Sequence, residues 1–149
     1  MPIRPQHRWL YPIDWPQITD AVRFGRAKGL CEHCGRPHGS LVYHLGDGRW
    51  WDEAARSWRS SHGRTVLKKR RAPFPNDAGV KATRVYLATA HLDHNPSNSN
   101  WRNLKAFCQR CHIIHDRPEH LRRRRLSFMM SRAVGDLFLG KYDNVLYHR

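Results

Sequence analysis

Four cysteines stand in two C-x-x-C pairs, Cys31 with Cys34 and Cys108 with Cys111. A C-x-x-C turn brings two thiolates to one side of the chain, and two such turns can close a tetrahedral site around one Zn2+ ion. Structural disulfides would need an oxidising compartment, for which the N-terminus carries no export signal, and a redox pair would not need a second copy. Covalent haem at Cys108-Gln-Arg-Cys111-His112 would leave the first pair unexplained. The spacing therefore predicts one structural zinc held by four cysteines.

A second group of residues with suitable chemistry precedes and overlaps the second cysteine pair. It combines imidazoles with a carboxylate and an amide: His91, Asp93, His94, Asn103, His112 and His115. A neutral histidine, with an unperturbed pKa of about 6.5, can take a proton from water or bind a metal ion. Hydrolysis of a phosphodiester needs such a base, and a cation that stabilises charge on the phosphoryl and leaving oxygens.

The order and spacing of these residues resemble the HNH family of endonucleases. That family has a histidine at the end of one strand, an asparagine about a dozen residues later, and a third histidine or asparagine about nine further on. Here His91 precedes Asn103 by 12 positions, and Asn103 precedes His112 by 9. The zinc-bearing branch of the family also places this motif between two C-x-x-C pairs, with Asn-Leu shortly before the second. The resemblance covers residues 31–36 and 85–116, and it implies two antiparallel strands, a loop and a helix around one divalent metal.

The resemblance also implies a role for each residue. His91 would be the general base, the Asn103 side chain would orient its imidazole, and His112 would bind a catalytic Mg2+ or Mn2+ ion. A site with one metal and one base would cut one strand per protomer, so double-strand cutting would require a dimer or two encounters. The expected protein is therefore a DNA endonuclease or nickase that acts on duplex DNA as a monomer or weak dimer.

Ala90 departs from the family pattern, in which the residue before the base is usually an Asp or His that binds the metal. In one interpretation Asp93, His94 or His115 supplies the missing ligand, and His91 remains the base. In a shifted interpretation Asp93 is the ligand and His94 is the base, although the spacing from His94 to the asparagine is then shorter than usual. A third interpretation is that Ala90 marks an inactive member. We favour His91 as the base.

The charge of the chain points to a polyanionic partner. The 149 residues include 27 Lys and Arg against 12 Asp and Glu, a formal net charge of +15. Nucleic acid is the commonest partner for such a balance, whereas no apolar run approaches the roughly 20 residues that cross a membrane. The resemblance implies a cytoplasmic protein of a bacterial or phage-infected cell. Two basic runs are candidates for phosphate contacts: Lys68, Lys69, Arg70 and Arg71, and Arg122, Arg123, Arg124 and Arg125.

The rival class is a non-catalytic zinc module that binds DNA or RNA. In that case His91 and His112 would be bystanders, and exposed aromatic side chains would stack on unpaired bases. Trp50, Trp51 and Trp58 are candidates for stacking, although filling a small core is their alternative use.

The elements that must position these residues can be predicted from local patterns. Pro16 and a rough apolar stripe predict a helix over residues 14–28. Two β-prone runs around Gly46-Asp47-Gly48 predict a hairpin, and residues 83–90 and 104–107 predict the core strands on either side of an Asn-rich turn. Asp116 and Pro118 predict the start of a final helix.

The expected fold is an α+β domain: a small ββα-metal (HNH) core held by a four-cysteine zinc, with an N-terminal helix, an added β-hairpin and a basic C-terminal helix. One domain is expected over 1–149, with an extended arm (1–15), a helix and first cysteine pair (16–36), a hairpin and basic loop (41–79), the catalytic core (83–116) and a basic helix and tail (117–149).

Overall fold

The computed structural model describes residues 5–66, 72–73 and 77–138. The chain forms two compact units, one ending at Ile113 and the other beginning at Ile114. Helices and strands are both present, which confirms the predicted α+β class. Among the described residues, no helix combines the length and the apolar character needed to cross a bilayer.

The N-terminal segment is helical from its first described residues, so the extended arm expected over 1–15 is wrong in this part. Pro5–Leu10 form a 3-10 helix, η1, which suits the fixed backbone torsion of the proline that opens it. Helix α1 covers Trp15–Asp20 and continues directly into a π-helical segment, η2, over Ala21–Arg26. The helix predicted over 14–28 is therefore present, and its second half is π-helical.

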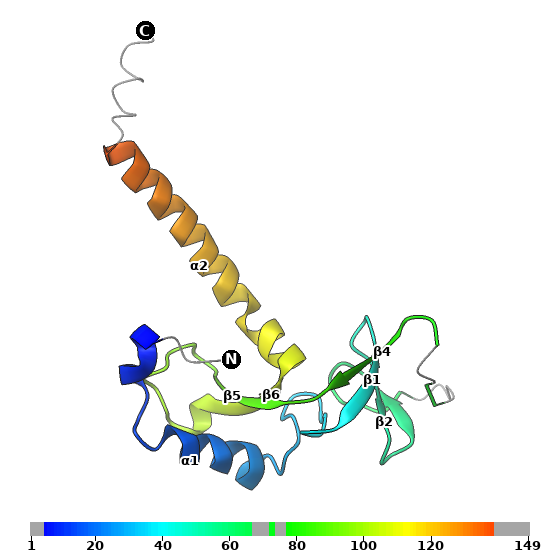
Figure 1. The fold of residues 1–149 in the computed structure, drawn as a ribbon. Coiled ribbons are helices and arrows are strands. Elements are labelled where there is room, and N and C mark those ends of the chain that lie inside the picture. The colour runs from blue at the N-terminus through cyan, green and yellow to red at the C-terminus, as the bar shows by residue number, and fades with distance from the viewer. Residues whose placement is uncertain (1–4, 67–71, 74–76, 139–149) are drawn as a thin grey trace. The chain divides into compact units, whose positions relative to one another are not determined.

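A four-stranded antiparallel sheet follows, with the strand order β3-β2-β1-β4 (Figure 1). Its strands are β1 (Leu41–Leu45), β2 (Trp50–Asp52), β3 (Ser57–Arg59) and β4 (Val80–Arg84). The predicted β1–β2 hairpin is confirmed. Strand β3 lies within a stretch whose polar composition predicts only loop, and it forms because Trp58 pairs with Trp51 across the two strands.

The strand predicted over 83–90 is divided between two sheets. Strand β4 ends at Arg84, and β5 covers Leu87–His91 in a separate pair with β6. Between them, the Val85 N–H donates to the Ser40 carbonyl at 2.9 Å, so the chain stays pinned to the first sheet as it passes to the second. The run as a whole favours a strand, so local propensity does not indicate where it divides. The division arises because β4 pairs with β1 and β5 pairs with β6.

Strands β5 and β6 form an antiparallel pair that leads directly into the long helix. Strand β6 covers Leu104–Cys108, with its first residue opposite His91, and α2 covers Gln109–Phe138. The expected order of strand, loop, strand and helix is present, and η2 packs against both strands (Figure 1). A separate final helix beginning at Asp116 is wrong, because α2 is continuous and contains Pro118.

The core of the first unit lies between η2, the β5–β6 pair and the β1–β2 hairpin. Its buried side chains are Val22, Val42, Trp50, Val85, Leu87, Ala90, Leu104, Ala106, Phe107 and the four cysteines. Trp51 and Trp58 are also buried and pack edge-to-face, with ring centroids 5.8 Å apart. All three tryptophans that could have stacked on bases therefore fill the interior, so they offer no stacking platform.

Candidate functional site

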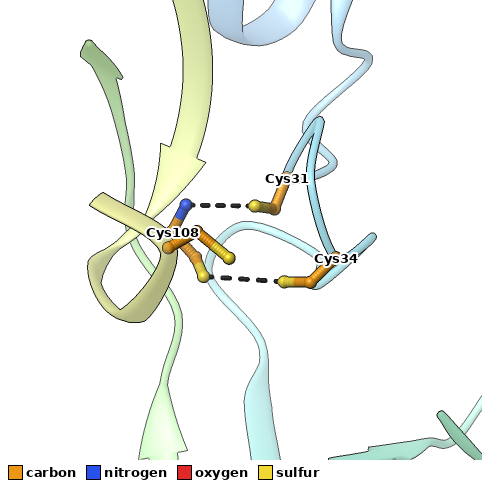
Figure 2. A group of neighbouring side chains, drawn as sticks. Cys31, Cys34 and Cys108 are labelled. Carbon is orange, nitrogen blue, oxygen red and sulfur yellow. Dashed lines mark hydrogen bonds between the residues drawn. The ribbon is translucent and has the colours of Figure 1, made fainter. Parts of the chain in front are cut away.

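The four cysteines meet in one buried cluster. Cys31 and Cys34 lie on a turn after η2, Cys108 ends β6, and Cys111 lies in the first turn of α2. All four thiols are free and at most 4% exposed, and their sulfur atoms lie within 4.8 Å of one another. The Cys34 and Cys108 sulfurs are 3.7 Å apart (Figure 2). A tetrahedral zinc with Zn–S bonds of about 2.3 Å spaces its sulfurs about 3.8 Å apart, so the cluster could hold a metal ion such as zinc.

Backbone N–H groups hold the turn that carries Cys31 and Cys34. The Cys108 N–H points to the Cys31 sulfur at 3.3 Å (Figure 2), a contact that favours a thiolate. Gly35 supplies a φ of 76°, and its N–H donates to the Cys31 carbonyl at 2.8 Å, which closes the turn. The neighbouring Cys108 thiol lowers the pKa of Cys31 and raises that of Cys34, as expected when closely packed thiols share protons.

Arg26 and Glu32 connect this turn to the strand pair, and the sequence motifs did not identify either residue. Glu32 accepts from the Ala106 N–H at 2.6 Å, and its own N–H donates to the Ala106 carbonyl at 2.9 Å. The Glu32 carboxylate also binds the Arg26 guanidinium at 2.7 Å. Arg26 reaches on to the Leu104 carbonyl at 2.6 Å and lies over the Trp101 ring. The first cysteine turn is thus attached to β6 by polar contacts as well as by the cysteines.

Asn103 closes the loop between β5 and β6. Its side-chain oxygen accepts from the Asp93 N–H at 3.1 Å, and its Nδ2 donates to Asp93 Oδ1 and to the Asn98 carbonyl at 2.8 Å each. The resemblance implies that the Asn103 side chain orients the His91 imidazole. Within the described part of the chain, that side chain bonds to the loop instead. Asn103 therefore holds the loop that follows His91.

Asp93 is the acceptor at the centre of this loop. Besides Asn103, its carboxylate accepts from the Asn95 N–H at 2.9 Å and from Asn98 Nδ2 at 2.7 Å. Desolvation raises the pKa of Asp93, but the hydrogen bonds from Asn103, Asn95 and Asn98 outweigh it and lower the pKa to about 2. The exposed carboxylate is therefore ionised throughout the physiological range. Next to it, His94 has a φ of 57°, a left-handed conformation that is uncommon outside glycine.

His91 ends β5 with its ring held between aromatic side chains. The ring stacks on Trp15 with centroids 5.0 Å apart and planes 10° from parallel, and Tyr11 approaches it edge-on at 5.8 Å. Burial lowers the pKa of His91, and the charge of Asp93 opposes that shift in part. The imidazole is therefore neutral at pH 7, in a plane fixed by its neighbours.

The other predicted residues that the structure describes lie on α2. His112 lies in the first turn of α2, directly after Cys111, whereas His115 lies on the part of α2 that belongs to the second unit. Arg122 and Arg123 both bind the Glu119 carboxylate, at 2.7 and 2.6 Å, and these bonds lower the pKa of Glu119 to about 2. Arg124 and Arg125 are exposed on the same helix. The run Lys68, Lys69, Arg70 and Arg71 and the tail 139–149 lie outside the described residues.

Comparisons with models of known protein families, with curated proteins and with solved structures gave no significant match.

Proposed function

We propose that the chain is a metal-dependent endonuclease of the HNH type that hydrolyses DNA phosphodiester bonds, one strand per protomer. The observation that carries the proposal is the loop between β5 and β6. The Asn103 side chain closes it by donating two hydrogen bonds and accepting a third. The loop begins after a half-buried neutral histidine, and the strand that follows it, β6, leads directly into α2. This arrangement supplies, in one place, a candidate base and a means of fixing its position.

His91 is suited to take a proton from water. Its lowered pKa keeps a nitrogen lone pair available at pH 7, which a general base requires. Stacking on Trp15 and the edge contact with Tyr11 restrict rotation of the ring. The imidazole therefore loses little conformational entropy when it is oriented for the reaction. Asn103 positions the loop, and hence the end of β5, without itself contacting the imidazole.

Asp93 is the residue of this loop best suited to hold a catalytic cation, and by the resemblance His112 would be a second ligand. Asp93 Oδ1 accepts two hydrogen bonds and Oδ2 accepts one, so Oδ2 retains a lone pair for an ion that prefers oxygen. The low pKa of Asp93 means that no proton has to leave first. A bound Mg2+ or Mn2+ would stabilise charge on the phosphoryl and leaving oxygens.

The net charge of +15 supports a nucleic-acid substrate. Within the basic run 122–125, Arg124 and Arg125 are the first candidates for phosphate contacts, because Arg122 and Arg123 are already bound to Glu119. Such contacts position a duplex without reading its sequence.

The proposal is tested by nicking of supercoiled plasmid with Mg2+ or Mn2+, with and without chelator. Loss of a general base typically lowers the rate about 10²–10⁴-fold, so we expect that loss for His91→Ala with zinc content and DNA binding retained. His120→Ala, which removes an exposed histidine of α2, is the matched control. His94→Ala as the deeper loss would instead identify His94 as the base.

Wild-type protein that makes no cut in duplex or single-stranded DNA with Mg2+, Mn2+, Co2+ or Ni2+ would refute the nuclease. If such a protein still bound DNA, the alternative function, a non-catalytic zinc module, would replace the nuclease proposal.

A further inference from the structure

Two arginines from the two cysteine turns converge on the β1–β2 turn. Arg36 lies just after the first pair, and its Nη2 donates to the Gly48 carbonyl at 3.2 Å. Arg110 lies within the second pair, and its guanidinium rests against Gly48, where any Cβ would overlap it. Gly48 is buried and has a φ of 93°, which glycine adopts without strain. Two cationic groups therefore meet at one small residue.

His44 and Lys81 lie beside these arginines. They face each other in the register of β1 and β4, and the His44 ring is half-buried. Burial lowers the pKa of His44, and the charges of Arg36, Lys81 and Arg110 lower it further, against the effect of a backbone carbonyl. The three cations thus act in the same direction on the pKa of one imidazole.

This group has no acidic partner among the described residues, whereas other arginines of the first unit do. Arg23, Arg26, Arg49 and Arg59 pair with Asp20, Glu32, Asp47 and Asp52, respectively. Asp47, the neighbour of Gly48 in sequence, binds Arg49 at 2.6 Å. Arg36 is only 5% exposed, and its Nε has no hydrogen-bond partner. Both the buried unpaired donor and the gathered like charges destabilise the protein, and a bound anion would offset both effects.

We propose that Arg36, Lys81 and Arg110, with His44 as their neighbour, form a binding site for a phosphate group, supplied by the backbone of a nucleic acid. Guanidinium groups present several N–H donors in a planar fork that fits phosphate oxygens, and Lys81 adds an exposed point charge. The site uses no residue of the loop between β5 and β6. Only the choice of nucleic acid as the source of the phosphate rests on the proposed function.

The test uses the zinc-containing full-length protein without added Mg2+ or Mn2+, so that cleavage plays no part. Inorganic phosphate is titrated while NMR follows the Gly48 amide and the His44 imidazole, and binding of a short DNA duplex is measured over a range of salt concentrations. Arg110→Gln is the principal variant, and Lys81→Gln, at an exposed position, is a second that leaves the core untouched. Arg49→Gln is the matched control, because it also removes one positive charge beside the β1–β2 turn, from an arginine that is paired with Asp47.

We expect saturable shifts of Gly48 and His44 in the wild type and in Arg49→Gln, and their loss in Arg110→Gln. Relative to the control, each test variant should flatten the slope of log K against log salt by about 0.9. Absence of phosphate-dependent shifts in the wild type would overturn the site. Phosphate shifts with duplex slopes equal to the control would overturn nucleic acid as the source. Phosphate and duplex binding here by a protein that cuts nothing would support the site and contradict the nuclease.

Discussion

Replacing Asn103 by alanine removes three hydrogen bonds that close the loop between β5 and β6. Two of them join Asn103 to Asp93, and the third joins it to the Asn98 carbonyl. Each bond contributes about 0.5–1.5 kcal/mol, and because the loop is exposed we take the lower half of that range, a total of about 2 kcal/mol. If loop opening alone takes up this loss, the ratio of closed to open loop falls about 30-fold, and nicking should fall by up to that factor.

Three measurements check this expectation. Urea unfolding with zinc bound gives the change in the free energy of unfolding, plasmid nicking gives the rate, and an NMR titration gives the pKa of Asp93. That pKa should rise in Asn103→Ala, because one of the hydrogen bonds that lower it is lost. Asn100→Ala is the matched control: Asn100 lies in the same loop and accepts from the Arg102 N–H at 3.0 Å. Unchanged unfolding and an unchanged Asp93 pKa in Asn103→Ala would refute the reasoning.

Cys108→Ser should unfold or aggregate the protein, because structural zinc contributes about 10–16 kcal/mol of binding energy, as much as a domain's whole stability. Metal analysis of the wild type should find tightly held zinc, and a protein without zinc would contradict this prediction. Changing Arg124 and Arg125 to Gln should flatten the salt dependence of DNA binding by about two units, and an unchanged slope would make them a solvated helix face. The pKa of Asp93 lies below its ordinary 3.8, so the stability it contributes is present above that pH and is lost as the pH falls towards about 2. The unfolding free energies of wild type and Asp93→Asn should converge over that window, and a constant difference would exclude this linkage. Ala90→Asp should destabilise the protein by about 3 kcal/mol and should not raise nicking; a stable, more active variant would overturn this.

The cysteine cluster and the strand pair could be predicted because short-range spacing carries them. A C-x-x-C turn can present its sulfurs in few ways, so two such turns leave little freedom in how four thiolates surround one ion. The antiparallel β5–β6 pair likewise follows from two apolar runs on either side of a turn-rich segment. Both features depend on local geometry that sequence spacing records directly.

Contacts between distant segments could not be predicted in the same way. Arg26 and Glu32 look like ordinary surface charges in sequence, yet they fasten the first cysteine turn to β6. Arg36 and Arg110 meet only because the two cysteine turns bring their neighbours to the same glycine. Strand β3 has only three residues, too few to show an alternating pattern, and it is recognised by its pairing with β2, where Trp58 lies opposite Trp51. In each case tertiary packing determines the contact, and the local sequence pattern does not indicate it.

Ala90 shows how the fold limits the ways in which the missing ligand can be supplied. It is 2% exposed and belongs to the core, whereas the next residue, His91, reaches the aromatic side chains at the end of β5. Successive residues of a strand face opposite sides, so a carboxylate at this position would be directed into the interior. Asp93, by contrast, is exposed, ionised and held in place by the loop. If the chain binds a catalytic cation, we therefore expect Asp93, held by the loop that Asn103 closes, to be a ligand in place of the residue that the family pattern puts before the base.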